Sequence, residues 1–364
     1  MKKVLIISKA FYPEISPRSF RTTQLANELV KQGCDVTVML PNLNEDYYLE
    51  YTKEHEVKFL NIGYTRFDKY INESLIARIV NRVLQLTTEF PTVELSFLLK
   101  KVLKKMSDYD LLISIAVPHP IHWGVAMALK HNNSFSGTWV ADCGDPFMGC
   151  KTDFYKKFFY FKYIEKNWCK RCNYISIPTE KSIDGYYPEF QHKIRIIPQG
   201  FNFDEIKIPQ HTKNTIPTFA YAGALTLHFR NPYPLLDYLL TLDFDFKFVI
   251  FTESDIIQPY IEKFKGKLEL RTYIPRHELL TFLGTMDFLV NFENNTSVQT
   301  PSKLIDYSIV NRPVISINKE FDTTIVDEFL DGNYSNQYKM PDLSKYDIKN
   351  VAAEFLSLCE KLSV

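Results

Sequence analysis

The sequence lacks long apolar runs and the common phosphate-binding loops. It has no stretch of about 18 apolar residues, so no segment is typical of a membrane-spanning helix. The apolar run near its start, Val4 to Ile7, is too short for the core of a signal peptide. No GxGxxG follows that run, and no P-loop motif occurs, which argues against a nicotinamide-type dinucleotide site and a P-loop nucleotide site. We expect a soluble cytoplasmic protein.

Cysteine is also scarce. The six cysteines include one Cys-x-x-Cys pair, Cys169 and Cys172, in a stretch of helical periodicity. One such pair supplies too few ligands for a tetrahedral zinc ion, and Cys143 and Cys150 lack a matching spacing. We also find no Asp-x-Asp pair that is convincing as a metal ligand. The sequence therefore predicts reduced thiols and no metal site.

The alternation of short apolar runs with helix-period stretches indicates the fold class. Strands alternating with helices predict parallel sheets covered on both faces. The pattern restarts after residue 210, and a chain of 364 residues is long enough for two hydrophobic cores. We therefore expect an α/β protein with two doubly wound domains, residues 1–203 and 204–345. A last helical segment, residues 346–364, can pack on either domain, including a return to the first.

Within this scheme some helices are predicted with definite bounds. The helical patterns cover residues 19–32, two stretches within 72–105, 121–131, a long helix over 154–172, and 346–362. The strands between them include "VLII", "VTVML", "LLISIA" and "TWVA" in the first half, and "TFAYA", "FKFVIF", "DFLVN" and "PVISI" in the second.

The segment "TPSKLIDY", residues 300–307, combines a helix start with charged side chains. Thr300 is a good N-cap and the proline after it suits the first helical position. Ser302 and Lys303 then occupy the first turn, where free backbone N–H groups and the helix dipole favour a phosphate. Asp306 lies on the same face as Lys303, and its carboxylate can accept hydrogen bonds from a ribose diol. The alternative is a capped amphipathic helix with a surface lysine.

A second segment, "YAGALTLHFRNPYPLL", has a similar logic. Gly223 ends a predicted strand and permits close approach of a ligand to the backbone. Arg230 precedes a helix start at Asn231 and Pro232, and an arginine there can bind a diphosphate with two parallel hydrogen bonds. The alternative is a turn with a solvent-exposed arginine.

These segments resemble family 4 retaining glycosyltransferases with the GT-B fold. "TPSKLIDYSIVNRPVISI" resembles the PSKxxEYxxxxxPVI segment of that family, and "IRIIPQGFNFDE" resembles its IxVIPNGVD stretch. "YAGAL…RNPYPLL" and "TWVADCGDPF" resemble segments of a branch that makes bacterial cell-surface polysaccharides. The opening "FYPEISPRSFRTTQLANELVKQGCDVTVML" is similar to the first loop and helix of the family. Together they span roughly residues 4–317, in family order.

The resemblance implies a GT-B fold, two Rossmann-like domains facing a cleft, and a specific division of labour. The second domain would bind a nucleotide-diphosphate sugar, with a UDP-sugar as the first expectation, and transfer would proceed with retention and without a metal or another cofactor. The donor-binding residues implied by the two segments and the first helix are Gly223, Arg230, Thr300, Ser302, Lys303, Asp306, Arg21 and Arg18. The sequence departs from the family in Ser16 and Pro17, which replace Gly-Gly, and in Asp306, which replaces Glu.

The first domain is expected to bind the acceptor. Asp142 and Asp145 follow the strand "TWVA", at the edge where open sheets bind ligands, and either can orient or deprotonate an acceptor hydroxyl. His119 follows "LLISIA" and can contact the sugar or a phosphate. For each residue a structural role remains an alternative: a loop carboxylate that caps a helix, and a loop histidine without chemistry.

The charge distribution suggests the partners. Residues 1–200 carry 27 basic against 21 acidic side chains, and residues 151–171 combine seven basic side chains with eight aromatic ones. Such a helix, together with the basic stretch 97–105, is expected either to lie on the anionic inner face of a membrane or to pack on its own sheet with solvated lysines. A lipid-linked or other glycan acceptor fits the first alternative. Nucleic-acid binding is not indicated.

Three functions therefore remain at this point. The leading hypothesis is a glycosyltransferase of bacterial surface polysaccharide synthesis. The second is a non-catalytic protein that keeps the GT-B shape for contacts with partners, which the missing Gly-Gly favours. The third is an epimerase of nucleotide sugars, for which the sequence has no matching set of acidic residues and histidine.

Overall fold

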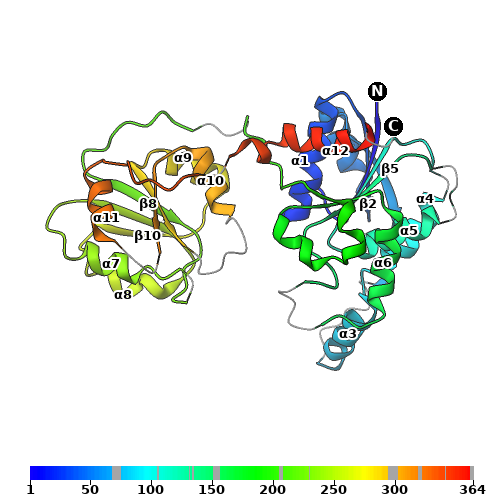
Figure 1. Cartoon of the computed structure of the whole chain (residues 1–364), viewed down its shortest axis with the longest axis horizontal. Coiled ribbons are helices and arrows are strands. Elements are labelled where there is room, and N and C mark those ends of the chain that lie inside the picture. Colours follow the sequence, from blue (N-terminus) through cyan, green and yellow to red (C-terminus); the bar gives the residue numbers. More distant parts are fainter. Residues whose placement is uncertain are drawn as a thin grey trace. The chain divides into compact units, whose positions relative to one another are not determined.

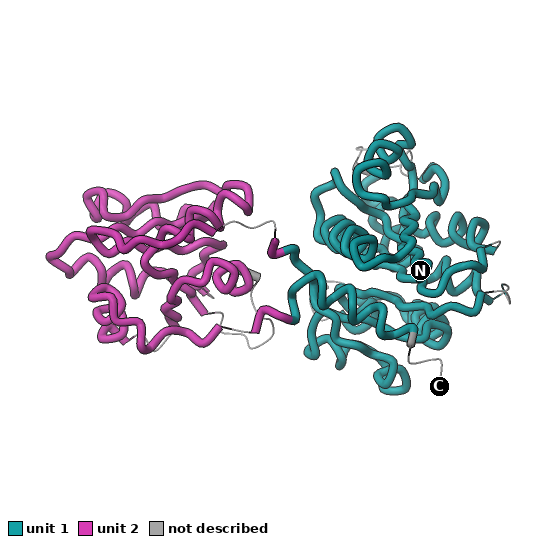
Figure 2. Tube along the Cα trace, turned by 90° about the horizontal axis from the view of Figure 1, so that it is seen from above, with its two compact units in different colours: residues 1–202, 345–364 teal, residues 203–344 magenta. Residues whose placement is uncertain are grey.

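The computed structural model divides the chain into two compact units (Figures 1 and 2). Unit 1 comprises residues 1–202 and 345–364, and unit 2 comprises residues 203–344. The structure describes residues 1–67, 75–104, 106–130, 132, 135–150, 156–204, 208–228, 230–293, 302–318, 322–340 and 342–360; for residues 75, 76, 302, 303 and 360 it describes only the backbone.

Unit 1 is built on a parallel sheet with the strand order β3-β2-β1-β4-β5-β6-β7. The strands are β1 Lys3–Ile7, β2 Asp35–Pro41, β3 Lys58–Gly63, β4 Leu111–Ala116, β5 Thr138–Cys143, β6 Tyr174–Ile177 and β7 Ile194–Ile196. The helices are α1 Pro17–Lys31, α2 Glu45–His55, α3 Leu75–Thr88, α4 Glu94–Leu103, α5 Pro120–Leu129, α6 Phe161–Arg171 and α12 Ile348–Glu360. The order reverses between β1 and β4, which is where open parallel sheets bind ligands.

Unit 2 repeats this plan on a smaller sheet, β10-β9-β8-β11-β12. Its strands are β8 Thr218–Ala222, β9 Lys247–Phe251, β10 Leu268–Arg271, β11 Phe288–Phe292 and β12 Val314–Ile317. Its helices are α7 Tyr233–Leu239, α8 Gln258–Ile261, α9 Arg276–Gly284, α10 Ser302–Val310 and α11 Thr323–Leu330. Here the switch of strand order lies between β8 and β11.

Alternating side chains of the strands build a core on each face of both sheets. In β1, Val4 and Ile6 belong to the core that also contains α1 and α12 residues, while Leu5 and Ile7 belong to the core with α4 and α5. The same period of two separates Phe219 from Ala220 in β8. Because both faces are covered, the strands are apolar throughout, which is why they appear as continuous apolar runs in the sequence.

The end of the chain returns to unit 1. Helix α12 buries Val351, Ala352 and Phe355 in the core that contains α1, and its trace has the colour of unit 1 in Figure 2. The packing of α12 also involves Arg21, whose guanidinium carbon lies 5.1 Å from the centre of the Phe355 ring. The last helix is thus a part of the first domain's core.

Two predictions about helices need correction. The long helix expected over 154–172 begins only at Phe161, and residues 151–155 lie outside the described part of the chain. Residues 156–160 instead attach to the end of α3: Lys157 pairs with Glu89 at 2.5 Å, and the Tyr160 hydroxyl donates to the Thr87 carbonyl. Helix α2, over residues 45–55, was not predicted. It buries only Tyr51, so its apolar periodicity is weak.

Candidate functional site

The carboxyl edge of the unit 2 sheet opens between β8 and β11. These two strands pair in register only at Phe288 with Phe219 and at Leu289 with Ala220. Beyond that point the hydroxyl of Tyr307, from α10, bridges the two strands where direct backbone hydrogen bonds between them end. It accepts a hydrogen bond from the Ala222 N–H at 3.0 Å and donates one to the Val290 carbonyl at 3.1 Å. Tyr307 therefore fixes α10 at the switch point of the sheet.

Gly223 and Arg230 lie in the loop that leaves β8. Gly223 has a φ of +145°, a conformation that other residues rarely adopt, and a Cβ there would approach the Tyr221 hydroxyl to 3.1 Å. The Arg230 N–H donates to the Thr226 carbonyl at 3.0 Å, and its Nη1 donates to the Ala224 carbonyl at 3.4 Å. These bonds hold the half-buried guanidinium beside the loop that Gly223 begins.

The predicted phosphate-binding turn lies at the start of α10. Ser302 and Lys303 are the first residues of that helix, and the positions of their side chains lie outside the described part of the structure, as does Thr300 altogether. The sequence prediction of a helix start here is confirmed for the backbone from Ser302 onward. The roles of these three residues remain predictions.

Asp306, one turn further along α10, forms an ion pair that the sequence did not indicate. Arg276, the first residue of α9, donates from Nε at 2.9 Å and from Nη2 at 2.6 Å, and both bonds end on Oδ1. The Asp306 side chain is 23% exposed. Within the described residues Oδ2 accepts no hydrogen bond, so this oxygen can accept one from a ligand.

The pKa shifts at this edge involve the same residues, Asp306, Arg276, Tyr307 and Arg230. Burial raises the pKa of Asp306, and Arg276 partly offsets that rise. Burial also raises the pKa of the Tyr307 hydroxyl, and the charged groups that act on it include Asp306 and Arg230. Arg230 and Asp306 thus both act on the residue that bridges β8 and β11, and Arg276 joins them through its pair with Asp306.

Sequence reasoning missed two of these residues. Tyr307 stands inside the segment that resembles the glycosyltransferases, but its role as a bridge between strands depends on two backbone groups far away in the sequence. Arg276 lies 30 residues before its partner and belongs to no quoted motif, so no sequence signal could have found it.

Glu293, which follows the last residue of β11, is exposed, and its carboxylate accepts a hydrogen bond from the Ser316 hydroxyl at 2.7 Å.

In unit 1 the structure brings two candidate residues together as a buried pair. The Arg21 guanidinium donates from Nη2 to Asp142 Oδ1 at 2.9 Å and from Nε to Oδ2 at 3.1 Å. The Ser176 hydroxyl adds a bond to Oδ1 at 2.6 Å, and Arg21 also donates to the carbonyl groups of Ile197 and Pro198. The two side chains are 3% and 4% exposed.

This pairing defines what the two groups can do. Burial alone would raise the pKa of Asp142, but Arg21 and the Ser176 hydroxyl outweigh it, and the pKa is lowered. A carboxylate with a lowered pKa and occupied oxygens is a poor proton acceptor, and an arginine with this many partners has few donors left for a phosphate. The geometry favours a structural role for the pair, which joins α1, β5, β6 and the loop after β7.

The other candidates in unit 1 lie around the loop after β5. Asp145 is exposed in that loop. Arg18 is half-buried, and its guanidinium lies so close to Gly144 that a Cβ there would overlap it. His119 is buried against Phe147, with ring centres 4.8 Å apart. Burial and the nearby His122, Lys157 and Arg18 lower the pKa of His119, so it is a neutral side chain.

The two sheets together identify the architecture. Two parallel, doubly wound sheets with helices on both faces are the fold of GT-B glycosyltransferases, and solved structures of such enzymes match the whole chain. The predicted fold class is thereby confirmed.

Particular solved structures extend this comparison. HepE from Anabaena in complex with UDP-glucose has a TM-score of 0.54 and 8% identity, covering 99% of this chain and 100% of that one. A glycosyltransferase from Rickettsia africae has a TM-score of 0.55 and 11% identity, with 99% and 96% covered. The lipopolysaccharide outer core galactosyltransferase WaaB has a TM-score of 0.52 and 12% identity, covering 99% of this chain and 98% of that one. At these identities the likeness establishes the fold. The sequence itself matches no protein-family model and no curated protein.

Proposed function

We propose that this chain is a retaining glycosyltransferase that moves a sugar from a nucleotide-diphosphate donor, with a UDP-sugar as the first choice, to a glycan or lipid-linked acceptor. The reaction would serve bacterial surface polysaccharide synthesis. The observation that carries the proposal is the charged edge of unit 2, where Arg276 pairs with Asp306, and where Asp306 and Arg230 both act on Tyr307 at the switch point of an open parallel sheet. A structure with the same fold is in complex with UDP-glucose, which supports this choice of donor.

Each residue of this edge has a role in the proposal. Arg230 and Lys303 would neutralise the diphosphate, and Thr300 and Ser302 would contact the same phosphates. Gly223 lets the donor approach the backbone. Asp306 Oδ2 accepts from the ribose diol, while Arg276 holds Oδ1 and so orients the carboxylate.

The chemistry requires no protein nucleophile. The acceptor oxygen forms a bond to the anomeric carbon on the face from which the diphosphate leaves, so the configuration is retained. The leaving diphosphate takes the bonding electrons, and the acceptor proton passes to it. Cationic side chains stabilise the charge that develops on the diphosphate, which is the term that lowers the barrier and makes a catalytic metal unnecessary.

The acceptor belongs to unit 1 in this proposal. Asp145 is the exposed carboxylate in the loop after β5, and it is suited to orient an acceptor hydroxyl. Arg18 lies against the same loop and can add a positive charge near a donor phosphate. Arg21 and Asp142 hold the strands and helices that position this loop.

The donor site is tested by calorimetry with UDP. Replacement of Arg230 or of Lys303 by alanine should each weaken UDP binding by about 1.5–3 kcal/mol, since each removes a hydrogen bond to a charged group. Lys247→Ala is the matched control because Lys247 begins β9, at the opposite edge of the sheet, and should leave the affinity unchanged. Equal UDP affinity in all four proteins would remove these residues from the site.

A second comparison tests the ribose contact and the catalytic claim. Asp306→Asn should weaken the binding of UDP but not of its 2′,3′-dideoxy analogue, which lacks the hydroxyl groups. Wild-type protein should also hydrolyse or transfer the sugar of its nucleotide-sugar donor. Binding of UDP without any turnover across a panel of UDP-sugars would favour the non-catalytic alternative.

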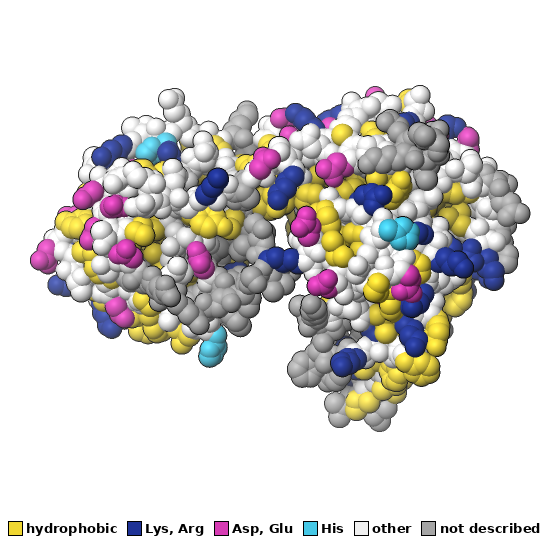
Figure 3. All heavy atoms as spheres, viewed as in Figure 1, with side chains coloured by type: hydrophobic (Ala, Val, Ile, Leu, Met, Phe, Trp, Pro, Cys, Tyr) yellow, Lys and Arg dark blue, Asp and Glu magenta, His cyan; other side chains and the backbone are white. Residues whose placement is uncertain are grey.

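An anionic membrane is the proposed location of a lipid-linked acceptor. Helix α3 exposes Ile79, Val80 and Val83, and the segment before α6 exposes Phe158 and Phe159. Arginine and lysine side chains lie beside apolar ones at the end of unit 1 that carries α3 (Figures 1 and 3). An apolar helix face with neighbouring cations is suited to bind at the interface of an anionic bilayer. No helix in the described ranges is both long and apolar enough to cross a membrane.

Two ion pairs affect which residues we expect to make this contact. Lys157 and Lys166 pair with Glu89 and Glu189, so part of the positive charge of residues 151–171 is neutralised. The protein should sediment with anionic liposomes at low salt and release at high salt. Ile79→Ser with Val83→Ser should reduce the bound fraction about tenfold or more. Phe244→Ser, an exposed apolar residue of unit 2, is the control. Equal loss with the control, or no sedimentation of the wild type, would favour a soluble acceptor.

A further inference from the structure

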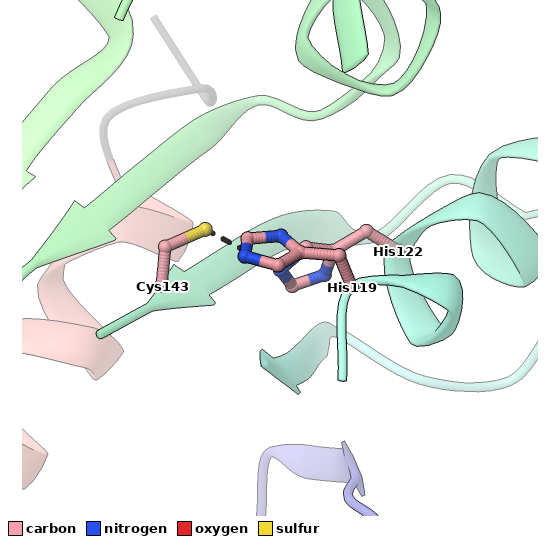
Figure 4. Close-up of side chains that lie close together, drawn as sticks. All are labelled: His119, His122 and Cys143. Carbon is pink, nitrogen blue, oxygen red and sulfur yellow. Dashed lines mark hydrogen bonds between the residues drawn. The ribbon is translucent and has the colours of Figure 1, made fainter. Parts of the chain in front are cut away.

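Three potential metal ligands converge inside unit 1, apart from the donor-binding edge. His119 precedes α5, His122 lies in its first turn, and Cys143 is the last residue of β5. One ligand atom from each residue, a ring nitrogen of either histidine and the sulfur of the cysteine, lies within 4.8 Å of the other two. The three residues are 5%, 0% and 1% exposed. Figure 4 shows the two imidazole rings and the thiol pointing into one space.

The orientation of His122 is fixed by a chain of hydrogen bonds. Its Nδ1 lies 2.8 Å from the Ser114 hydroxyl oxygen, which also accepts a bond from the indole Nε1 of Trp139 at 2.8 Å. The other ring nitrogen, Nε2, therefore faces Cys143 Sγ at 3.3 Å. Metal-binding histidines commonly have this arrangement, with one nitrogen held by a protein group and the other directed at the ion.

His119 supplies the second observation. Its Nδ1 is buried and has no partner of ordinary hydrogen-bond geometry among the described residues, although the Asp145 backbone acts on the ring as a hydrogen-bonding group. A buried polar atom without a partner costs about 1–3 kcal/mol, and such atoms in native proteins generally have a missing water, ion or ligand as their explanation. The loop after β4 places this ring beside His122, with centres 5.7 Å apart.

We propose that His119, His122 and Cys143 bind a zinc ion in unit 1. Two imidazoles and one thiolate are a donor set that suits zinc, which is usually four-coordinate, so a water molecule would complete the site. Binding would displace the proton of the Cys143 thiol to solvent and leave a thiolate on the ion. The ion would join the loop after β4 to the end of β5, next to the loop that carries Asp145. The proposal is independent of the donor-binding function, and it makes His119 a metal ligand instead of an acceptor contact.

Cobalt substitution of the purified full-length chain tests the proposal. Co²⁺ should bind with the near-ultraviolet charge-transfer band of a cysteine thiolate ligand and the visible bands of a tetrahedral site. Zinc should abolish both, and elemental analysis of protein purified with zinc should find one ion per chain. Cys143→Ser should remove the charge-transfer band, and Cys34→Ser, another buried cysteine of unit 1, should leave it intact.

A further variant keeps the test informative if Cys143→Ser does not fold. Ser114→Ala changes no ligand but releases His122, and it should weaken zinc binding about 10- to 100-fold. Folded wild-type protein that binds no Co²⁺, or binds it without the charge-transfer band, overturns the proposal. So does a band that persists in folded Cys143→Ser protein. If the zinc-free protein still binds UDP, the donor site does not depend on the metal, and the two proposals can be tested independently.

Discussion

Both units place an arginine–aspartate pair near the carboxyl edge of their sheet, and the two pairs differ in burial and in how many carboxylate oxygens the arginine binds. In unit 1, Arg21 binds both oxygens of Asp142, and both side chains are almost fully buried. In unit 2, Arg276 binds only Oδ1 of Asp306, and its side chain is 41% exposed. The same two residue types thus form a fully buried contact in one unit and a partly exposed one in the other.

The difference teaches how burial assigns roles. A buried ion pair whose oxygens are all occupied cannot exchange partners without leaving a charge uncompensated, so it holds elements together. A half-exposed pair keeps an oxygen free and loses little when a ligand replaces water. The presence of an arginine–aspartate pair at the carboxyl edge of each sheet therefore does not give the two pairs the same function. We expect substitutions in the unit 1 pair to change mainly stability, and substitutions in the unit 2 pair to change mainly ligand binding.

The largest effect should come from matched substitutions in the two pairs. Asp142→Asn leaves the buried Arg21 without its counter-charge and should lower the free energy of unfolding of unit 1 by about 3–5 kcal/mol. Asp306→Asn alters a partly exposed pair and should change that of unit 2 by about 1 kcal/mol or less. Tryptophan fluorescence reports unit 1 selectively, because Trp123, Trp139 and Trp168 all lie there. Circular dichroism reports both units. Equal losses would contradict the division of roles.

A somewhat smaller effect concerns Glu165, a buried acid of unit 1. Its Oε1 accepts from the Met148 N–H at 3.4 Å, its Oε2 has no partner among the described residues, and burial raises its pKa from 4.5 to about 7. Folded protein therefore binds more protons than unfolded protein between these values. The free energy of unfolding of unit 1 should therefore fall by up to about 3 kcal/mol as the pH rises from 4.5 to about 7, and this carboxyl should cause no further loss at higher pH.

The substitution Glu165→Gln isolates this contribution. It should flatten the decline between pH 4.5 and about 7 and make unit 1 more stable than the wild type at pH 8. Glu189→Gln is the control, because Glu189 is a half-exposed acid paired with Lys166. An unchanged pH dependence of tryptophan-detected unfolding in Glu165→Gln would show that this carboxyl is not the group that titrates.

The smallest expected effect probes the bridge in unit 2. Tyr307→Phe leaves the Ala222 N–H and the Val290 carbonyl without the hydroxyl and should destabilise unit 2 by about 1–3 kcal/mol. Tyr233→Phe removes a single, half-buried bond to Ile256 and should cost less. Urea unfolding followed by circular dichroism compares them, while tryptophan fluorescence should stay unchanged. A loss no larger than in Tyr233→Phe would mean that the strands do not depend on the bridge.

Much of the architecture was predictable because it depends on local patterns. The runs "VLII", "LLISIA" and "FKFVIF" became buried strands, since strands covered on both faces are apolar at every position. The helix predicted over 19–32 is α1, which begins two residues earlier, at Pro17, because Ser16 caps it by accepting from the Ser19 N–H. The helix predicted over 154–172 is confirmed only for Phe161–Arg171, because residues 156–160 bind to the end of α3, a contact that local periodicity does not indicate.

The candidate site was predictable only in part. Gly223, Arg230 and Asp306 stood in recognisable segments, and the structure places all three at the carboxyl edge of unit 2. Tyr307 and Arg276 act through partners brought together by folding, so their roles could not be read from spacing. Arg21 and Asp142 were expected in ligand contacts, and the structure binds them to each other instead.

By itself the sequence determined the alternation of strands and helices, the α/β class and the division into two doubly wound sheets. Those features follow from hydrophobic periodicity and turn residues, which act over a few positions along the chain. Only the tertiary structure decided which charges are buried. Arg21 meets Asp142 across 121 residues, and Arg276 meets Asp306 across 30. Partners at such distances are chosen by how the sheets and helices pack, and burial then decides whether a charged pair serves stability or a ligand.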